Sequence, residues 1–216
     1  MDITIESLNA THVAATTDDV RNWSNGSVKR RMQHGCSKDE WYETIGTLWD
    51  QRIFGCRTAF ACACGRFFGG QYLRAVCDRC GVRVGTEKAR WLRFSHINLT
   101  HPIAHPFRGD AATLEAIPII PAAYWDQYGR ERFSKAYEEI VRLVHADCTP
   151  EDLTGAFGVV IANIEALLDH LMDHETEMVE TLAKGLVLKI PAEQVSQEIE
   201  AQLAHHNWDD LKLADD

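Results

Sequence analysis

The stretch "CACGRFFGGQYLRAVCDRCG", residues 62 to 81, holds four of the seven cysteines of this chain. Cys62 and Cys64 are separated by one residue, Cys77 and Cys80 by two, and twelve residues lie between the pairs. A glycine directly follows each pair. Two short cysteine pairs in glycine-assisted turns bring four thiolates around one tetrahedral Zn²⁺. We therefore predict a structural zinc site with these four cysteines as ligands.

Two other interpretations of the cysteines stay open. Four ordinary buried cysteines are one, but the segment has few aliphatic residues, and a metal supplies about 10 kcal/mol or more of apparent folding free energy to such a module. The second is a redox dithiol at Cys77 and Cys80, although such motifs usually open a helix. A shell of four thiolates has no open position, so the predicted role of the zinc is structural rather than catalytic.

Length and composition indicate an ordinary globular protein. The chain has 216 residues, of which 45% are hydrophobic and 25% charged, enough to bury a real core. No basic segment followed by an apolar stretch opens the sequence, and the apolar stretch "GAFGVVIANIEALL" is interrupted by Asn163 and Glu165. We therefore expect a cytoplasmic protein with no membrane partner, where clustered cysteines are more often metal ligands than disulfides.

Charge is unevenly distributed along the chain. The net charge is -10, yet residues 52–108 hold ten Lys or Arg against two Asp or Glu, a net +8, whereas residues 149–216 hold three against fifteen, a net -12. A cationic segment and an anionic segment therefore lie in one chain. We expect the acidic part either to cover the cationic surface or to mimic nucleic acid toward another basic partner.

Basic and aromatic residues alternate through the cysteine-rich segment. Aromatics suited to base stacking lie between cations suited to phosphate contact, which makes DNA or RNA a candidate partner. A small module also has little interior, so its arginines lie on the surface whatever they contact. The candidate nucleic-acid-binding residues are Arg66, Arg74, Arg79, Arg83, Lys88, Arg90 and Arg93, interleaved with Phe67, Phe68, Tyr72 and Trp91.

The remaining segments predict an α+β fold that is mainly α, in which a small zinc-ribbon-like β module precedes an antiparallel helical hairpin and C-terminal helices. Apolar residues recur at three-to-four spacing in "SKDEWYETIGTLW" (37–49), and Thr17 precedes an acidic first helical turn. Pro118 and Pro121 predict an extended connector. The expected domains are an N-terminal helical segment (1–51), a zinc module (52–108), the connector (109–131), the hairpin (132–172) and an acidic C-terminal helical region (173–216).

The helical hairpin has clear start and stop signals. One apolar face repeats along residues 130–146 and a second along 153–171, and Thr149, Pro150 and Asp152 between them form a capping-box start. We therefore expect two helices that pack antiparallel. A possible strand at residues 2–8 and a last helix starting at Pro191 complete the expected elements.

Several motifs together resemble the amino-terminal part of the β′ subunit of bacterial DNA-directed RNA polymerase. "DDVRNWSNGSVK" is similar to the family's opening, "DQRIFG" to the stretch before its zinc site, "CACG" and "CDRCGVRV" to the zinc site, and "HINLTHPIAHPF" to the segment that follows. "AIPIIPAAYWDQYGRERF" resembles the family's lid. The resemblance implies that Cys62, Cys64, Cys77 and Cys80 bind zinc, and that the hairpin corresponds to the clamp coiled coil on which sigma factors dock.

The chain also departs from that family. The catalytic aspartate signature that holds magnesium is absent, a long piece is missing between Phe107 and Ile117, and the hairpin turn is short and acidic. We therefore expect no catalysis by this chain alone, and a role in transcription through binding of polymerase subunits, a sigma factor or nucleic acid. The alternatives are the N-terminal piece of a split polymerase, or a zinc scaffold used outside transcription. The expected partner-binding residues of the hairpin are Tyr137, Arg142, His145, Asp147 and Glu151.

Overall fold

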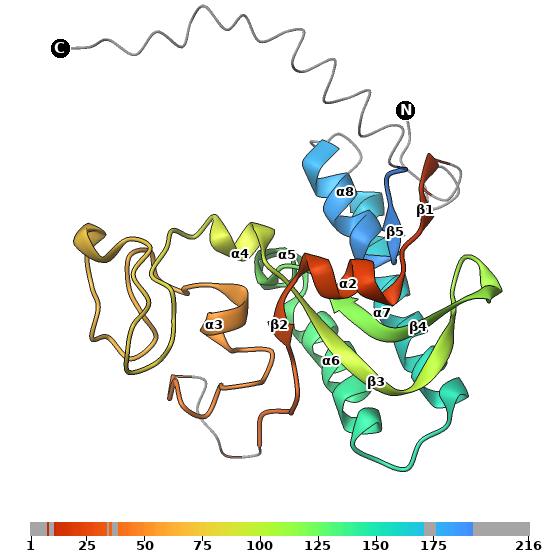
Figure 1. Ribbon diagram of the computed structural model, residues 1–216, viewed down its shortest axis with the longest axis horizontal. Helices are drawn as coiled ribbons and strands as arrows, with labels where there is room; N and C mark the ends of the chain where they lie inside the picture. The colour runs from red at the N-terminus through yellow and green to blue at the C-terminus, as the bar shows by residue number, and fades with distance from the viewer. Residues whose placement is uncertain (1–7, 9–10, 34, 36–38, 171–175, 192–216) are drawn as a thin grey trace, which may run out of the picture.

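The structure is a computed structural model that describes residues 8, 11–33, 35, 39–170 and 176–191. It is a mixed α+β fold, as the sequence predicts (Figure 1). The elements are β1 (Val13–Ala14), α2 (Thr17–Trp23), β2 (Ser24–Ser27), α3 (Gln51–Phe54), the 3₁₀ helix η1 (Gly70–Tyr72), α4 (Ala89–Leu92), β3 (Phe94–His105), β4 (Gly109–Ile119), α5 (Ala122–Tyr128), α6 (Arg130–Val144), α7 (Pro150–His170), α8 (Thr176–Gly185) and β5 (Leu188–Lys189).

A three-stranded sheet lies at the centre of the larger part of the molecule. Its order is β2-β3-β4, with β3 and β4 antiparallel and β2 parallel to β3. Ile97 on β3 is opposite Ile117 on β4, and both are buried. Helices α6 and α7 pack against β3, so the hydrophobic core forms between the hairpin of strands and the hairpin of helices.

The expected extended connector is instead part of this sheet. Residues 109–119 are extended, but they form strand β4, and residues 122–128 form helix α5. Pro118 is tolerated because β4 is an edge strand, where a missing N–H removes no hydrogen bond to a further strand. Likewise β3, which was expected to belong to the zinc module, is part of the central sheet.

The predicted helix at residues 37–49 is wrong for the residues that the structure describes. Residues 39–49 form successive turns, with backbone hydrogen bonds from Glu43 to Glu40 and from Thr47 to Thr44. Gly46 adopts a φ of +75°, and its N–H donates to the Asp50 carboxylate at 2.7 Å. Side chains thus form hydrogen bonds with backbone groups that a helix would pair internally. The apolar periodicity of the segment does not reveal these bonds.

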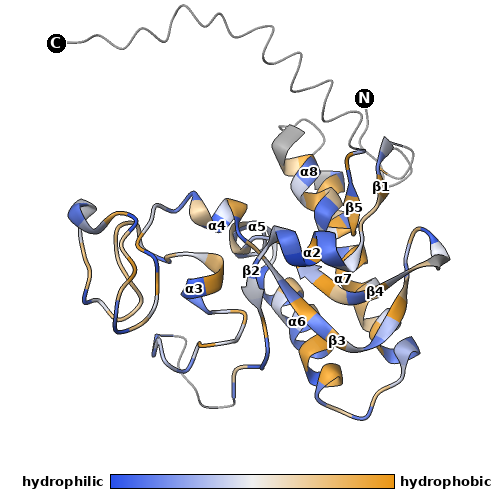
Figure 2. Ribbon diagram, viewed as in Figure 1, coloured by the Kyte–Doolittle hydropathy of each residue, from blue (hydrophilic) through white to orange (hydrophobic). Residues whose placement is uncertain are grey.

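The helical hairpin is confirmed. Phe133, Tyr137, Ile140 and Val141 are buried on α6, and Leu153 and Phe157 are buried on α7. Thr149 and Asp152 form the predicted capping box, in which the Asp152 N–H donates to Thr149 Oγ1 at 3.2 Å and the Thr149 N–H to Asp152 Oδ2 at 2.9 Å. Figure 2 shows hydrophobic residues along these helices and the sheet, whereas α2 is mostly hydrophilic.

The last segment that the structure describes pairs with residues near the N-terminus. Strand β5 pairs with β1, and the Lys189 ammonium contacts the Asp19 carboxylate at 2.6 Å. The N-cap of α2 is Thr16 rather than the expected Thr17, because the Thr16 hydroxyl accepts the Asp19 N–H. Apart from Leu8, the strand expected at residues 2–8 lies outside the described residues, as does the helix expected after Pro191. No described helix has the length and hydrophobicity required to span a membrane.

Candidate metal centre

Four cysteine sulfurs gather at one end of the molecule. The Sγ atoms of Cys62, Cys64, Cys77 and Cys80 all lie within 4.8 Å of one another. Cys62 and Cys64 are 3.6 Å apart, and Cys64 and Cys77 are 3.7 Å apart, measured between sulfurs. These separations exclude disulfide bonds, and all four cysteines are free. The predicted ligands therefore form one site that can bind a single metal ion.

Two similar turns present the sulfurs. The Gly65 N–H donates to the Cys62 carbonyl at 3.1 Å, and the Gly81 N–H donates to the Cys77 carbonyl at 2.8 Å. Both glycines have a positive φ, +74° for Gly65 and +71° for Gly81. Residues with a Cβ are strained in this conformation, which gives a physical reason for a glycine after each cysteine pair.

Short backbone pairings join the two turns into a module. Ala61 pairs with Phe68, and Val76 pairs with Arg83, so each turn closes a small hairpin. The Phe67 N–H also donates to Cys62 Sγ at 3.2 Å. The interior is small and consists of the cysteines, Val82, Val84 and Cys56, with a stacked pair of Phe67 and Tyr72 rings at 4.5 Å against it.

The thiols of Cys64, Cys77 and Cys80 differ in the direction of their pKa shifts. Burial raises the pKa of the Cys80 thiol to about 12. Burial also acts to raise the pKa of Cys77, but the backbone N–H groups of Cys80 and Arg79 and the neighbouring thiols lower it to about 7. Burial raises the pKa of Cys64 as well. Four thiolates this close repel one another, so a bound cation is what makes their joint deprotonation favourable.

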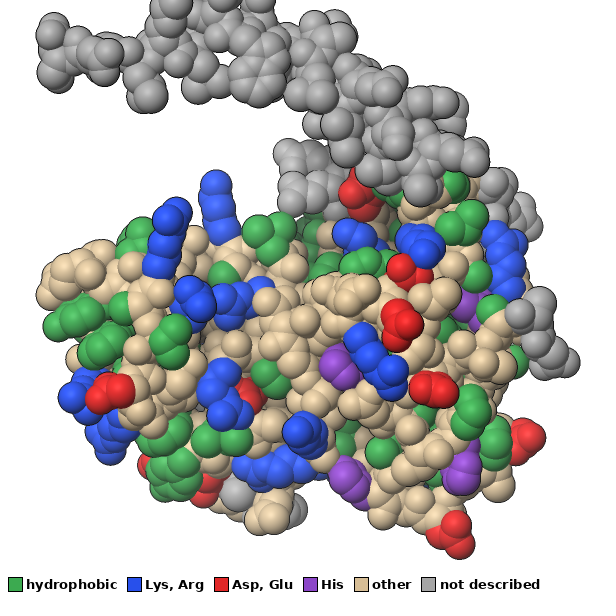
Figure 3. All heavy atoms as spheres, in the orientation of Figure 1, with side chains coloured by type: hydrophobic (Ala, Val, Ile, Leu, Met, Phe, Trp, Pro, Cys, Tyr) green, Lys and Arg blue, Asp and Glu red, His purple; other side chains and the backbone are tan. Residues whose placement is uncertain are grey.

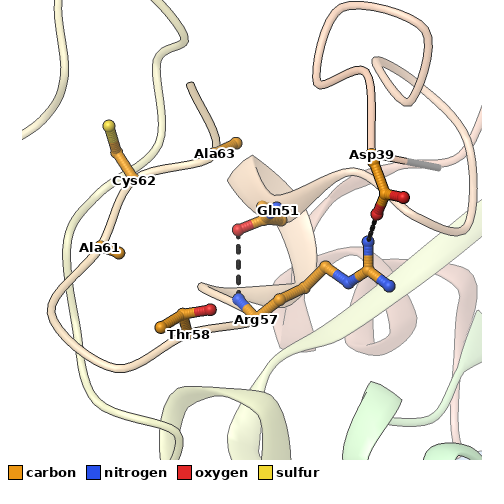
Figure 4. Close-up of a pocket in the computed structure, with 7 residues that line it drawn as sticks. All are labelled: Asp39, Gln51, Arg57, Thr58, Ala61, Cys62 and Ala63. Atoms are coloured by element: carbon orange, nitrogen blue, oxygen red, sulfur yellow. Dashed lines mark hydrogen bonds and ion pairs between the residues drawn. The ribbon is translucent and has the colours of Figure 1, made fainter. Parts of the chain in front are cut away.

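A polar hollow lies beside this site (Figure 4). It has a volume of about 410 Å³. The Arg57 N–H donates to Gln51 Oε1 at 3.1 Å, and the Arg57 guanidinium contacts Asp39 at 3.5 Å. The Cys62 sulfur points away from both Arg57 and Gln51 in Figure 4. The Cys62 sulfur therefore does not face the polar groups of this hollow.

The predicted nucleic-acid-binding residues separate into two groups. Arg74, Arg79, Arg83 and Lys88 are exposed, and Arg66 is exposed but contacts Asp78 at 3.1 Å. Arg90 and Arg93 are not free to bind a phosphate in the same way. The Arg90 side chain is only 15% exposed and pairs with Asp126, and Arg93 is partly buried with its guanidinium 3.4 Å from the Arg52 carbonyl.

Arg90 instead connects the module to the helical part. Its second guanidinium nitrogen is 3.5 Å from the Gly55 carbonyl, and Asp126 also accepts from Arg130 at 2.7 Å. The sequence patterns did not single out Asp126. Its pair with Arg130 has the i,i+4 spacing typical of helix ion pairs, but its pair with Arg90 spans 36 residues and has no local signal.

The expected partner-binding residues also differ in exposure. Tyr137 is fully buried, and its hydroxyl accepts the Ile120 N–H at 3.3 Å, so its assignment to a partner surface is wrong. The aromatic ring packs in the core because it lies on the apolar face of α6. Arg142 is paired with Glu139 at 2.6 Å, and a His145 ring nitrogen contacts the Lys29 carbonyl. Asp147 and Glu151 are exposed.

Comparison with known proteins relates part of the chain to one large enzyme subunit, although no family model matches it. It is 41% identical over 93 residues to the DNA-directed RNA polymerase subunit beta' of Lactobacillus delbrueckii subsp. bulgaricus, and 40% identical over 93 residues to that of Lactobacillus helveticus. Each match covers 42% of this chain and 7% of the relative.

A third relative extends the same relationship. The DNA-directed RNA polymerase subunit beta' of Thermosipho africanus is 35% identical over 112 residues, which is 50% of this chain and 6% of the relative. The chain therefore spans only 6–7% of the length of these curated relatives. About two fifths to one half of the chain is related to β′ subunits, in agreement with the resemblance stated above.

Proposed function

We propose that this chain is a non-catalytic, zinc-binding relative of the β′ subunit that acts in transcription by binding polymerase components, a sigma factor or nucleic acid. The observation that carries the proposal is the combination of partial homology to β′ with a gathered set of four cysteines. The matches cover too little of the relatives to extend their activity to this chain.

Zinc is the proposed metal because the sulfur geometry fits it. Zn–S bonds of about 2.3 Å in a tetrahedron place neighbouring sulfurs about 3.8 Å apart. The two measured Sγ–Sγ distances are 3.6 and 3.7 Å. Soft thiolates favour zinc over magnesium or calcium, which prefer oxygen ligands. With all four positions filled by protein sulfur, the ion would stabilise the module and leave no position for a substrate.

The proposed functional units follow from this arrangement. The metal module presents exposed arginines to a polyanion, and the tip of the α6–α7 hairpin presents exposed carboxylates at Asp147 and Glu151 to a protein partner. The ion pairs of Asp126 with Arg90 and Arg130 connect the module to the start of α6. We propose that the chain works as an adaptor whose metal site keeps the basic surface folded.

Metal analysis tests the first half of the proposal. Mass spectrometry of the intact native protein should find one zinc per chain, and the Cys64→Ser variant should retain markedly less. The Cys148→Ser variant is the matched control, because Cys148 is also a free buried cysteine but lies outside the cluster. Full zinc content in the Cys64→Ser variant would contradict the assignment.

Capture from lysate tests the second half. We would immobilise the zinc-loaded full chain, incubate it with nuclease-treated lysate of its host, and ask whether polymerase subunits or a sigma factor are retained. If the hairpin tip binds the partner, the double variant Asp147→Ala and Glu151→Ala should no longer retain polymerase subunits or a sigma factor. The control is Glu131→Ala with Lys135→Ala, an exposed pair at the other end of α6.

The outcomes separate the candidate roles. Retention of polymerase subunits that is lost only in the tip variant supports a hairpin-dependent role in transcription. Stoichiometric copurification with a second chain that carries the catalytic part of β′ would instead indicate a split polymerase. Retention of neither polymerase subunits nor a sigma factor would leave a β′-related scaffold with another task.

A further inference from the structure

The metal module carries exposed apolar and basic side chains, here together called the module face. Three backbone pairings align its segments: Phe60 donates to the Gly85 carbonyl at 2.9 Å, Arg74 to the Val84 carbonyl at 2.9 Å and Gly69 to the Phe60 carbonyl at 2.8 Å. Its members are the exposed residues Phe68, Leu73, Arg74, Val76, Arg79 and Arg83.

The apolar members of the module face are unusually exposed. The exposed fractions are 70% for Phe68, 45% for Leu73 and 51% for Val76. Val76 and Arg83 are opposite each other in an antiparallel pair, so an apolar and a basic side chain share one side of the module. Hydrophobic side chains lie together at the module end of the molecule in Figure 3, and exposed apolar patches mark places where another segment binds.

The basic members of the module face pair with no carboxylate of the described residues. Within the described residues, Arg74, Arg79 and Arg83 make no ion pair with a carboxylate, and the Arg83 guanidinium lies 3.5 Å from the Arg74 carbonyl, which holds the two basic residues together. Figure 3 shows the same character on one side of the molecule, where hydrophobic and basic side chains lie together at the module end with few acidic ones. An occupant of the module face should therefore be both acidic and apolar.

We propose that the C-terminal segment of the same chain, residues 192–216, binds the module face. This segment has seven Asp or Glu and one Lys, a net charge of -6. Val195, Ile199 and Leu203 recur at four-residue spacing, and Trp208 and Leu211 follow. The segment thus offers carboxylates for the unpaired arginines and large apolar side chains for Phe68, Leu73 and Val76.

The segment is tethered to the described part of the chain at Pro191. Its 25 residues begin directly after Pro191. They span about 85 Å when extended and about 38 Å as a helix. The effective concentration of a tethered partner is about 1 mM, so a contact with a dissociation constant of about 100 µM would be closed about 90% of the time. The basic surface would then be covered until a competing polyanion displaces the segment.

This inference concerns the regulation of the surface that the proposed function assigns to nucleic acid, but it does not require polymerase binding. Its test is the rate at which phenylglyoxal modifies individual arginines of the full chain, followed by mass spectrometry. Arg74 and Arg83 report on the module face, and Arg132 on α6, which is exposed and distant in sequence, is the internal reference.

Two variants with equal charge changes are compared with the native chain. The test variant carries Glu198→Gln, Glu200→Gln and Asp209→Asn in the C-terminal segment. The control carries three substitutions at exposed carboxylates elsewhere, Asp18→Asn, Glu115→Gln and Glu131→Gln. We expect modification of Arg74 and Arg83 to be about tenfold faster in the test variant than in the native chain, because the segment would cover these residues about 90% of the time in the native chain. In the control variant the rates should equal those of the native chain. Salt at about 0.5 M should remove the protection in the native chain because it screens the charges.

Addition of a synthetic peptide of residues 192–216 to the test variant provides a second measurement. It should restore protection half-maximally at about 100 µM, consistent with the coverage estimated above. Equal modification rates in the native chain and the test variant would overturn the proposal. Protection that increases with protein concentration would also overturn it, because the segment would then bind a second copy. Failure of the polymerase capture experiment would refute the proposed function but leave these rates unaffected.

Discussion

Substitution of Gly65 by Ala should weaken zinc binding, and the backbone gives the reason. Gly65 has a φ of +74°, and apart from its own chain neighbours no heavy atom of the described residues lies within 4 Å of the position where a Cβ would be added. The cost of an alanine is therefore conformational strain alone, about 1–2 kcal/mol in the left-handed region. Because folding of a small module is coupled to metal binding, this strain appears in the metal affinity. About 1.4 kcal/mol corresponds to a tenfold change, so we expect an apparent Kd for zinc about 5–30 times higher.

Gly70→Ala is the matched control. Gly70 lies in the same module, is exposed and also has no heavy atom within 4 Å of an added Cβ, but it does not have a positive φ. Its substitution lowers the entropy of the unfolded chain without strain, so zinc affinity should be unchanged or slightly higher. The assay is competition with a chromophoric zinc chelator at fixed pH. Equal affinities of the two variants would refute the argument that the turn after Cys64 requires a left-handed residue.

Three further predictions concern stability, measured as the midpoint of urea unfolding. Gly185→Ala should cost about 1–3 kcal/mol, because an added Cβ would lie 2.5 Å from the buried Ile120 side chain; an unchanged midpoint would contradict this close packing. Asn163→Leu should stabilise the fold by about 1 kcal/mol, since the buried Asn163 amide nitrogen has no hydrogen-bond partner among the described residues; a lower midpoint would show that the amide is needed. Burial lowers the pKa of His105, whose ring nitrogen contacts the Val187 carbonyl at 2.9 Å, so the unfolded chain binds the proton more readily and stability should fall between pH 7.5 and 5.5, less so in His105→Gln.

The local features of this protein could be predicted from the sequence. The spacing of the four cysteines and the glycine after each pair are contained in twenty residues, and the structure brings the sulfurs together as expected. The same holds for the capping box at Thr149 and Asp152 and for the apolar face of α6. Each of these depends on neighbours within a few residues, so periodicity and spacing are sufficient evidence.

Only the tertiary structure decided the features that depend on distant residues. Residues 39–49 have a helical apolar pattern, yet the Arg30 side chain donates to the carbonyls of Glu43 and Ile45, and the segment forms turns. The residues from 109 to 119 form a strand because β3 supplies the pairing.

The same distinction explains the site residues. Arg90 looks like a surface residue in the sequence, but Asp126 pairs with it in the fold. Its environment is set by a segment 36 residues away, beyond the reach of a local pattern. Local spacing thus determined which cysteines gather at one site, whereas packing between distant segments decided which arginines and aromatic side chains remain exposed.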